Sequence, residues 1–166
     1  MAKSAAKSDL QELFVHTLKD VYYAENAITK ALPKMMEAAN SKELKAAFEK
    51  HLGETENQIA RLKEVFELVG EKATGVPCEA IKGILKEGDE VAEEFEDSKA
   101  LDAGLIAAAQ AVEHYEIARY GALASWADEL GMSDAAALLN ETLEEEEATD
   151  EALTQLAETK INVSAA

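Results

Sequence analysis

The feature that most constrains the fold is an internal repeat at a fixed offset of 91 residues. Residues 20–62 align with residues 111–153 without a gap, and ten of the 43 aligned positions are identical. The identities include two acidic pairs, Glu25 with Glu116 and Glu54 with Glu145. Two similar helical hairpins that each carry inward carboxylates are the parts of a two-metal site in a helix bundle.

Apolar residues recur at steps of three and four along four long segments, a pattern that predicts amphipathic helices. The segments cover about residues 8–39, 41–70, 100–130 and 133–160. The expected N-caps are Ser8, Ser41 and Ser133, and the expected helix-ending glycines are Gly70 and Gly131. Pro33 is expected to kink the first helix or to begin a new segment.

The lengths of the connections indicate how the helices are arranged. Short turns near residues 40–41 and 131–132 make each consecutive pair an antiparallel hairpin. The connection of about thirty residues between the hairpins can run the length of a bundle, and residues 79–95 form an amphipathic segment within it. The predicted fold is therefore all-α: a ferritin-like four-helix bundle of two antiparallel hairpins, joined by a long crossover that carries a short fifth helix.

Composition and charge narrow the class of protein further. We expect residues 9–161 to form one bundle domain, residues 1–8 to be a flexible tail and residues 162–166 to fray. A net charge of −18 argues against nucleic-acid binding and suits a protein that attracts cations. The single cysteine, Cys78, excludes an internal disulfide, and no apolar run is long enough to span a membrane. We therefore expect a cytoplasmic protein with neither membrane nor nucleic-acid partners.

Several acids occupy helix faces that are otherwise apolar. Glu25 lies on the apolar stripe of the first helix, and Glu54 lies between His51 and Gln58 on that of the second. The third helix adds two acids three residues apart, which therefore share a face. Burying ionised carboxylates is very costly unless a cation compensates them, and metal ions do so well. The candidate metal ligands are Glu25, His51, Glu54, Glu113, Glu116 and Glu145.

The fourth helix carries a run of four acids at residues 144–147, of which only one or two can point inward. Its apolar stripe and the 91-residue offset both select Glu145, with Glu146 a close second. Glu54 and Glu145 are the expected bridging ligands because the repeat relates them. Two iron ions are the expected cofactor, and manganese also accepts such an oxygen-rich site.

Each candidate also has an ordinary structural interpretation. Most glutamates on so acidic a chain are solvated, and a single inward histidine such as His51 is more often a core residue than a ligand. Trp126 and the tyrosines are interpreted as packing residues, and Cys78 as unreactive. The metal hypothesis depends on the joint placement of six residues on four inward faces.

Four stretches of the chain resemble the YciF/YciE family of bacterial ferritin-like stress proteins. They are LKDVYYAE (18–25), KHLGET (50–55), AAAQAVEHYEI (107–117) and ETLEEEEATD (141–150). The likeness runs from about Asp9 to Val163. It implies a ferritin-like bundle with a candidate di-iron site, often a dimer, in the bacterial cytoplasm and linked to stress responses.

More distant di-iron relatives carry a Glu on one helix and Glu-x-x-His on the next, and this chain matches that pattern only in part. Glu25 matches the first position and Glu54 the acid of the second. Asn57 stands where the histidine is expected, and His51 precedes its acid instead of following it. The third helix, with Glu113 and Glu116, resembles the paired acids of rubrerythrin-type sites.

Three functions are compatible with these features. The first is a non-haem di-iron protein that reacts with peroxide or dioxygen, and the second is a ferroxidase or Fe(II) buffer that uses the same site. One cysteine cannot build a rubredoxin-type iron centre, so a redox reaction would need an external electron donor. The third is a metal-free helical interaction or stress-protection protein. A homodimer is expected through an apolar edge near Met35 and Met36 or through the crossover helix.

Overall fold

The computed structural model describes residues 8–166, so the tail expected at residues 1–8 lies outside the described part except for Ser8. The main helices are α1 (Asp9–Ala38), α2 (Lys42–Leu68), α3 (Glu79–Glu94), α4 (Leu101–Glu129) and α5 (Ser133–Leu156). A π-helical turn, Ala157–Ile161, and a final helical turn, α6 (Asn162–Ala165), follow α5. Residues 162–165, which were expected to fray, therefore continue as helix. No strand is present between residues 8 and 166.

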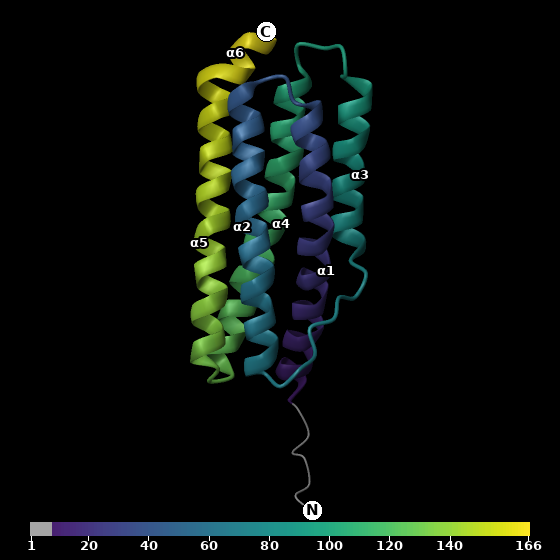
Figure 1. The fold of residues 1–166 in the computed structure, drawn as a ribbon. Helices are drawn as coiled ribbons and strands as arrows, with labels where there is room; N and C mark the ends of the chain where they lie inside the picture. The colour runs from purple at the N-terminus through teal and green to yellow at the C-terminus, as the bar shows by residue number, and fades with distance from the viewer. Residues whose placement is uncertain (1–7) are drawn as a thin grey trace, which may run out of the picture.

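The four long helices lie side by side as a bundle (Figure 1). α1 packs against α2 and α4, and α5 packs against the same two helices, so the four form a closed ring. The hairpins α1–α2 and α4–α5 are those that the sequence predicts, and α3 packs outside the ring on α1 and α4. The predicted all-α fold, with a long crossover that carries a short fifth helix, is confirmed.

The ends of the helices follow the expected capping chemistry at most positions. Ser8 Oγ accepts a hydrogen bond from the backbone N–H of Gln11 at 3.3 Å, and Ser41 caps α2 in the same way. Gly70 and Gly131 adopt positive φ angles of 70° and 71°, which a glycine tolerates at a helix end. Ser133 is the first residue of α5 and not, as the sequence predicts, its cap. Of the two alternatives at Pro33, a new segment is wrong, because α1 continues through this exposed proline to Ala38.

Two contacts hold the turns of the bundle in place. The carboxylate of Asp102, at the start of α4, accepts hydrogen bonds from the backbone N–H groups of Asn40 and Ser41, both at 2.7 Å. The crossover lies against α1, where the backbone N–H of Val76 donates to the carbonyl of Lys19 at 3.1 Å. The first contact joins the α1–α2 turn to α4, and the second joins the crossover to α1.

The apolar core is divided into two clusters along the bundle axis. One contains Phe14, Leu18, Val21, Leu62, Phe66, Tyr120, Leu123 and Leu139. The other contains Ala24, Ile28, Leu32, Phe48, Leu105, Ile106, Val112 and Leu153. On α2, α4 and α5 the positions between the two clusters carry buried polar residues, and on α1 a buried glutamate follows Ala24 directly. A layer of polar groups therefore separates two apolar halves of one bundle.

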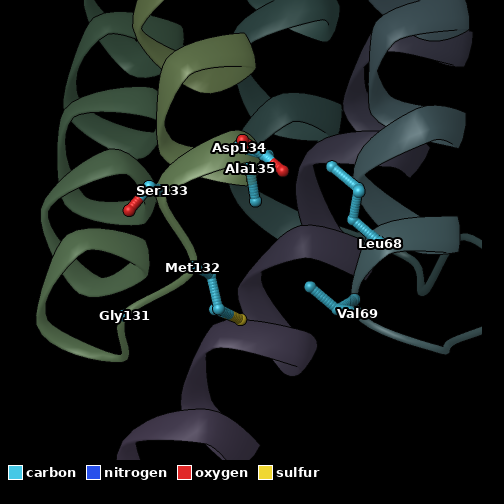
Figure 2. A pocket seen from close by; sticks show the side chains of 7 residues that line it. All are labelled: Leu68, Val69, Gly131, Met132, Ser133, Asp134 and Ala135. Carbon is cyan, nitrogen blue, oxygen red and sulfur yellow. The ribbon is translucent and has the colours of Figure 1, made fainter.

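An open pocket of about 320 Å³ lies at one end of the bundle, between the end of α2 and the α4–α5 turn (Figure 2). It is lined by Leu68, Val69, Gly131, Met132, Ser133, Asp134 and Ala135. None of the buried acids reaches it, so the candidate site lies in the polar layer inside the bundle. Among residues 8–166, no helix is both long and apolar enough to cross a membrane.

Candidate metal centre

Every long helix contributes to the polar layer. Its members are Glu25 on α1, His51, Thr55 and Gln58 on α2, Glu113 and Glu116 on α4, and Thr142 and Glu146 on α5, and all are buried. The spacing on each helix is three, four or seven residues, so these side chains continue the apolar stripes inward. Four carboxyl groups and one imidazole consequently meet in the interior.

The carboxyl groups of α1 and α4 lie against each other at one side of the layer. Glu25 and Glu116, which the 91-residue offset relates, are both fully buried, and each shifts the pKa of the other. The hydroxyl of Tyr120 donates a short hydrogen bond to Oε1 of Glu25. The second oxygen of Glu25, Oε2, has no hydrogen-bond partner. One oxygen of Glu25 is thus held by the protein and the other is available.

His51 lies between acids from two other helices. Its Nδ1 is 2.9 Å from Oε1 of Glu113, and its Nε2 is 4.0 Å from Oε2 of Glu146. The carboxyl groups of Glu113 and Glu146 also lie within hydrogen-bond reach of each other, and Nε2 of His51 has no hydrogen-bond partner. The hydroxyl of Thr55 donates to the backbone carbonyl of His51 at 2.9 Å and does not contact the imidazole.

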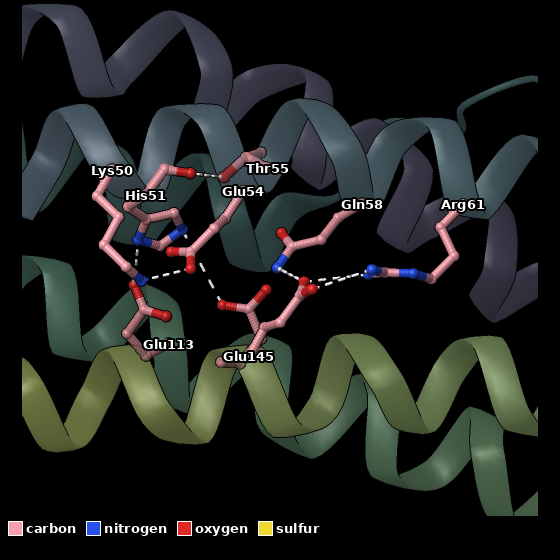
Figure 3. Close-up of polar contacts among 9 residues, drawn as sticks. Lys50, His51, Glu54, Thr55, Gln58, Arg61, Glu113 and Glu145 are labelled. Atoms are coloured by element: carbon pink, nitrogen blue, oxygen red, sulfur yellow. Dashed lines mark hydrogen bonds and ion pairs between the residues drawn. The ribbon is translucent and has the colours of Figure 1, made fainter.

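The structure corrects the choice of the inward acid on α5. Glu146 is buried, with 1% of its surface exposed, whereas the side chain of Glu145 is 29% exposed. Arg61 forms a two-pronged contact with the Glu145 carboxylate at 2.9 and 3.0 Å, and Gln58 donates to it at 3.0 Å (Figure 3). Partial burial alone would raise the pKa of Glu145, but the bonds from Arg61 and Gln58 outweigh it and lower the pKa. Glu145 is therefore a paired residue at the α2–α5 edge.

Glu54 occupies the corresponding edge position on α2. Its side chain is 24% exposed, and Oε1 is paired with Lys50 one turn earlier. Its other oxygen, Oε2, is buried and has no hydrogen-bond partner. Its charge also helps to raise the pKa of Glu113, although less than burial does. Glu54 therefore borders the polar layer without lying fully inside it.

The interior acids favour the protonated form when no cation is present. Burial raises the pKa of Glu25 and of Glu113 to about 8, and neighbouring acids contribute to both shifts. Burial and the nearby carboxylates raise the pKa of Glu116 and of Glu146 well above the usual range. A cation placed among them would reverse this tendency, because it stabilises the charged form of each carboxylate.

The donor set fits a metal centre. Ligand atoms of His51, Glu113, Glu116 and Glu146 all lie within 4.8 Å of one another. These four residues and Glu25 provide eight buried nitrogen or oxygen atoms without hydrogen-bond partners. Buried polar atoms normally have a hydrogen-bond partner. A group of buried polar atoms without partners in one place therefore needs an explanation, such as a bound ion. Oxygen and imidazole ligands suit iron and manganese.

Sequence reasoning ranked Glu146 second to Glu145, although a signal that favours Glu146 existed. Glu146 stands seven residues after Leu139 and seven before Leu153, and both leucines are buried. Two helical turns bring a residue back to nearly the same face, so this spacing selects Glu146. Of the six predicted ligands, the structure brings Glu25, His51, Glu113 and Glu116 together inside the bundle. It places Glu54 at the border of the polar layer and Glu145 outside it.

This combination defines a class of protein: an all-helical bundle with ferritin-like connectivity and a buried cluster of carboxylates and one histidine. Residues 9–166 match a family described as a domain of unknown function, DUF892, and the chain belongs to this family. The chain is 47% identical over 157 residues to Protein YciF of Escherichia coli strain K12, covering 94% of this chain and 95% of that protein. The resemblance to the YciF/YciE family is thereby confirmed.

Solved structures agree with this assignment. The crystal structure of the E. coli stress protein YciF matches with a TM-score of 0.89 at 46% identity, covering 94% of this chain and 99% of that one. YcfI from Rhodopseudomonas palustris matches with a TM-score of 0.86 at 49% identity, over 92% of this chain and 98% of that one. A protein from Xanthomonas campestris shares the fold at 23% identity, with a TM-score of 0.74 over 95% of this chain and 96% of that one.

Proposed function

We propose that the polar layer binds a pair of divalent metal ions, with iron as the physiological metal. The observation that supports this most is the set of buried carboxylate oxygens on three helices that have no hydrogen-bond partner. Such groups cost free energy in a folded protein unless a ligand compensates them. A family of bundles with carboxylates on facing helices uses the same arrangement for two-metal sites.

Five residues would hold the metals: Glu25, His51, Glu113, Glu116 and Glu146. Four carboxylates balance the four positive charges of two divalent ions, so this set gives a neutral site when every acid is ionised. Glu54 is proposed as an additional ligand at the border, because its Oε2 is buried without a partner. Glu145 is not proposed as a ligand, since Arg61 and Gln58 already occupy its oxygens.

Bound Fe(II) would supply electrons for the reduction of peroxide or dioxygen. The protein's own contribution is to exclude water from the layer, to hold one oxygen of Glu25 through Tyr120, and to provide Nε2 of His51, which has no hydrogen-bond partner within the protein. Burial and the charge of Glu25 raise the pKa of Tyr120 well above its usual range, so this hydroxyl remains a donor. The site can serve either repeated turnover or a single oxidation of stored Fe(II).

We place the protein in the bacterial cytoplasm, as a homodimer that takes part in a stress response and relies on an external electron donor for any turnover. The stress response is proposed because a relative at 46% identity is named a stress protein. The need for a donor is proposed because Cys78, the only cysteine, cannot build a second iron centre. We further propose that residues 9–161 form one domain.

Metal binding is tested by titrating the metal-free protein with Fe(II) without oxygen and by metal analysis of protein made in iron-supplied cells. The expected result is about two ions per chain. Glu116→Gln should reduce the stoichiometry or weaken affinity. The matched control is Glu147→Gln, which removes the same charge from an exposed position on α5. Absence of metal uptake by the wild-type protein would instead support the metal-free interaction or stress-protection function.

Turnover and buffering are separated by mixing the Fe(II)-loaded protein rapidly with peroxide and with dioxygen. Repeated consumption of oxidant with an added reductant would support an oxidase or peroxidase. A single stoichiometric oxidation would support a ferroxidase or an Fe(II) buffer. Both outcomes are compatible with the same five ligands, so this experiment addresses the reaction and not the site.

A further inference from the structure

Two small cavities are lined mainly by residues of α1, α3 and α4. Figure 1 shows α3, the short helix, packed on this side of the bundle. The volumes of the cavities are about 20 and about 10 Å³. The cavities share four wall residues, Ala31, Met35, Leu85 and Val112. Because the two cavities share these wall residues, they are neighbours, and together they outline a path with an outer and an inner part.

The two ends of this path have different chemistry. The outer cavity ends at Gly88 and at Asp89, an exposed residue of α3. The inner cavity ends at His51 and Glu113, two residues of the polar layer. The path therefore leads from the surface beneath α3 to the donor atoms that the proposed function assigns to metal.

The walls between these ends select what can occupy the path. Alanine, methionine, leucine and valine side chains offer no hydrogen-bond donors, so a water molecule or an ion would lose its hydration there without replacement. Small apolar cavities of this kind stay dry and accept apolar guests. The volumes suit one very small molecule at a time and exclude any organic substrate.

We propose that this path admits dioxygen, a small apolar oxidant, to the metal centre from beneath α3. The inference rests on the proposed function, because dioxygen has a use at the inner end only if metal is bound there. It assigns a role to the short helix α3, because Leu85 of α3 lines both the outer and the inner cavity. Charged Fe(II) ions gain nothing from this path and would reach the layer elsewhere.

The path can be tested in the metal-free protein, with dioxygen itself as the probe. Dissolved dioxygen is paramagnetic and accelerates the nuclear relaxation of methyl groups that it contacts. Under oxygen pressure, we expect stronger acceleration for the methyls of Ala31, Leu85 and Val112 than for those of Leu123 and Leu139. Leu123 and Leu139 are buried in the other half of the core, whereas Ala31 and Leu85 are half-buried, so the deciding comparison is between Val112, which is buried, and these two leucines. Equal acceleration at Val112 and at these leucines would overturn the proposal.

A second experiment narrows the path. Ala31→Leu adds bulk to the walls that the two cavities share and should remove the methyl relaxation effect. It should also slow the oxidation of bound Fe(II) by dioxygen several-fold while leaving Fe(II) affinity unchanged. Ala152→Leu, at an exposed position of α5, is the matched control. Val112→Ile adds one methylene to the same walls and replaces Ala31→Leu if that variant does not fold.

The outcomes separate the two proposals. If relaxation and oxidation rate are unchanged in the narrowed variants, the path is overturned and the metal site stands. If the wild-type protein does not take up Fe(II), the proposed function is contradicted, and the path cannot deliver an oxidant to a metal. The relaxation of the methyl groups still shows whether dioxygen enters the path.

Discussion

The hydroxyl of Tyr120 donates a hydrogen bond to Oε1 of Glu25, and both side chains are completely buried. This contact links α4 to α1 within the polar layer, and it uses one of the two oxygens of an acid that we assign to metal. Tyrosine here is a positioning residue, because it acts on the proposed metal site through Glu25.

Removal of this hydroxyl should be measurable without any metal. Tyr120→Phe leaves Oε1 of Glu25 without its donor, and we expect the free energy of unfolding to fall by about 1–3 kcal/mol. Urea unfolding of the metal-free protein measures the change. Tyr22→Phe is the matched control, because the ring packing of Tyr22 against Phe66 and the hydrogen bond from Asn26 to its backbone carbonyl are both kept by phenylalanine. A loss of equal size in the two variants would contradict the assignment.

The adjacent acids of α5 should respond in opposite ways. Glu146→Gln removes a buried carboxylate from the donor set, so we expect metal affinity to fall at least about tenfold, or about 1.4 kcal/mol. Glu145→Gln removes the partner of Arg61 and should leave metal affinity nearly unchanged while it weakens the α2–α5 contact. Calorimetric titration with Fe(II) or Co(II) compares the two. Equal losses of affinity would show that both acids ligate.

The stability of the metal-free protein should depend on pH through the interior acids. Glu25 and Glu113 have a pKa of about 8 in the folded state, against an ordinary value of 4.5. Between these values the folded state holds more protons than the unfolded state, so stability falls as pH rises. The loss should extend from about pH 5 to about pH 8, and each unit of pKa shift corresponds to about 1.4 kcal/mol.

Urea unfolding across this range, with and without saturating metal, measures the effect. Metal should reduce or reverse the dependence, because it binds the ionised carboxylates. Glu25→Gln removes one titrating group and should make the metal-free curve shallower. A midpoint that rises with pH in the metal-free protein would contradict the assignment of raised pKa values.

A structural contact far from the site provides a fourth prediction. Asp102 accepts two backbone hydrogen bonds from the α1–α2 turn, and it is 8% exposed. Asp102→Ala leaves both donors without a partner and should destabilise the protein by about 1–3 kcal/mol. Metal stoichiometry should not change, because the residue lies outside the polar layer. Thermal unfolding and metal titration of the same sample check both statements.

The fold could be predicted from the sequence because its signals are local and repeated. Apolar periodicity gave the helices, and the lengths of the connections gave the hairpins and the crossover. Pro33 left two alternatives, a kink or a new segment, and the second is excluded because α1 continues to Ala38. A proline near the end of a long helix, on its exposed side, can be accommodated when packing holds the rest of the helix.

The repeat predicted the site correctly for one of its two acidic pairs. Glu25 and Glu116 are related by the offset, and both point inward, whereas His51 and Glu113 were predicted from the apolar stripes alone. The same offset relates Glu54 to Glu145, but Glu54 lies at the border of the polar layer and Glu145 lies outside it. The pairing of Glu145 with Arg61 joins residues 84 positions apart, and no local pattern indicates such a contact.

The division of the core into two apolar halves has a consequence for how the helices align. If one helix slid along its neighbours by a single turn, Glu116 or Glu146 would face leucines, and its former partners would face empty space. Both changes bury polar groups without compensation and are costly. Each long helix therefore has one axial position that suits all the others. The polar layer thus specifies the axial register of the four long helices and disfavours arrangements in which one helix is shifted along the others, before any metal binds.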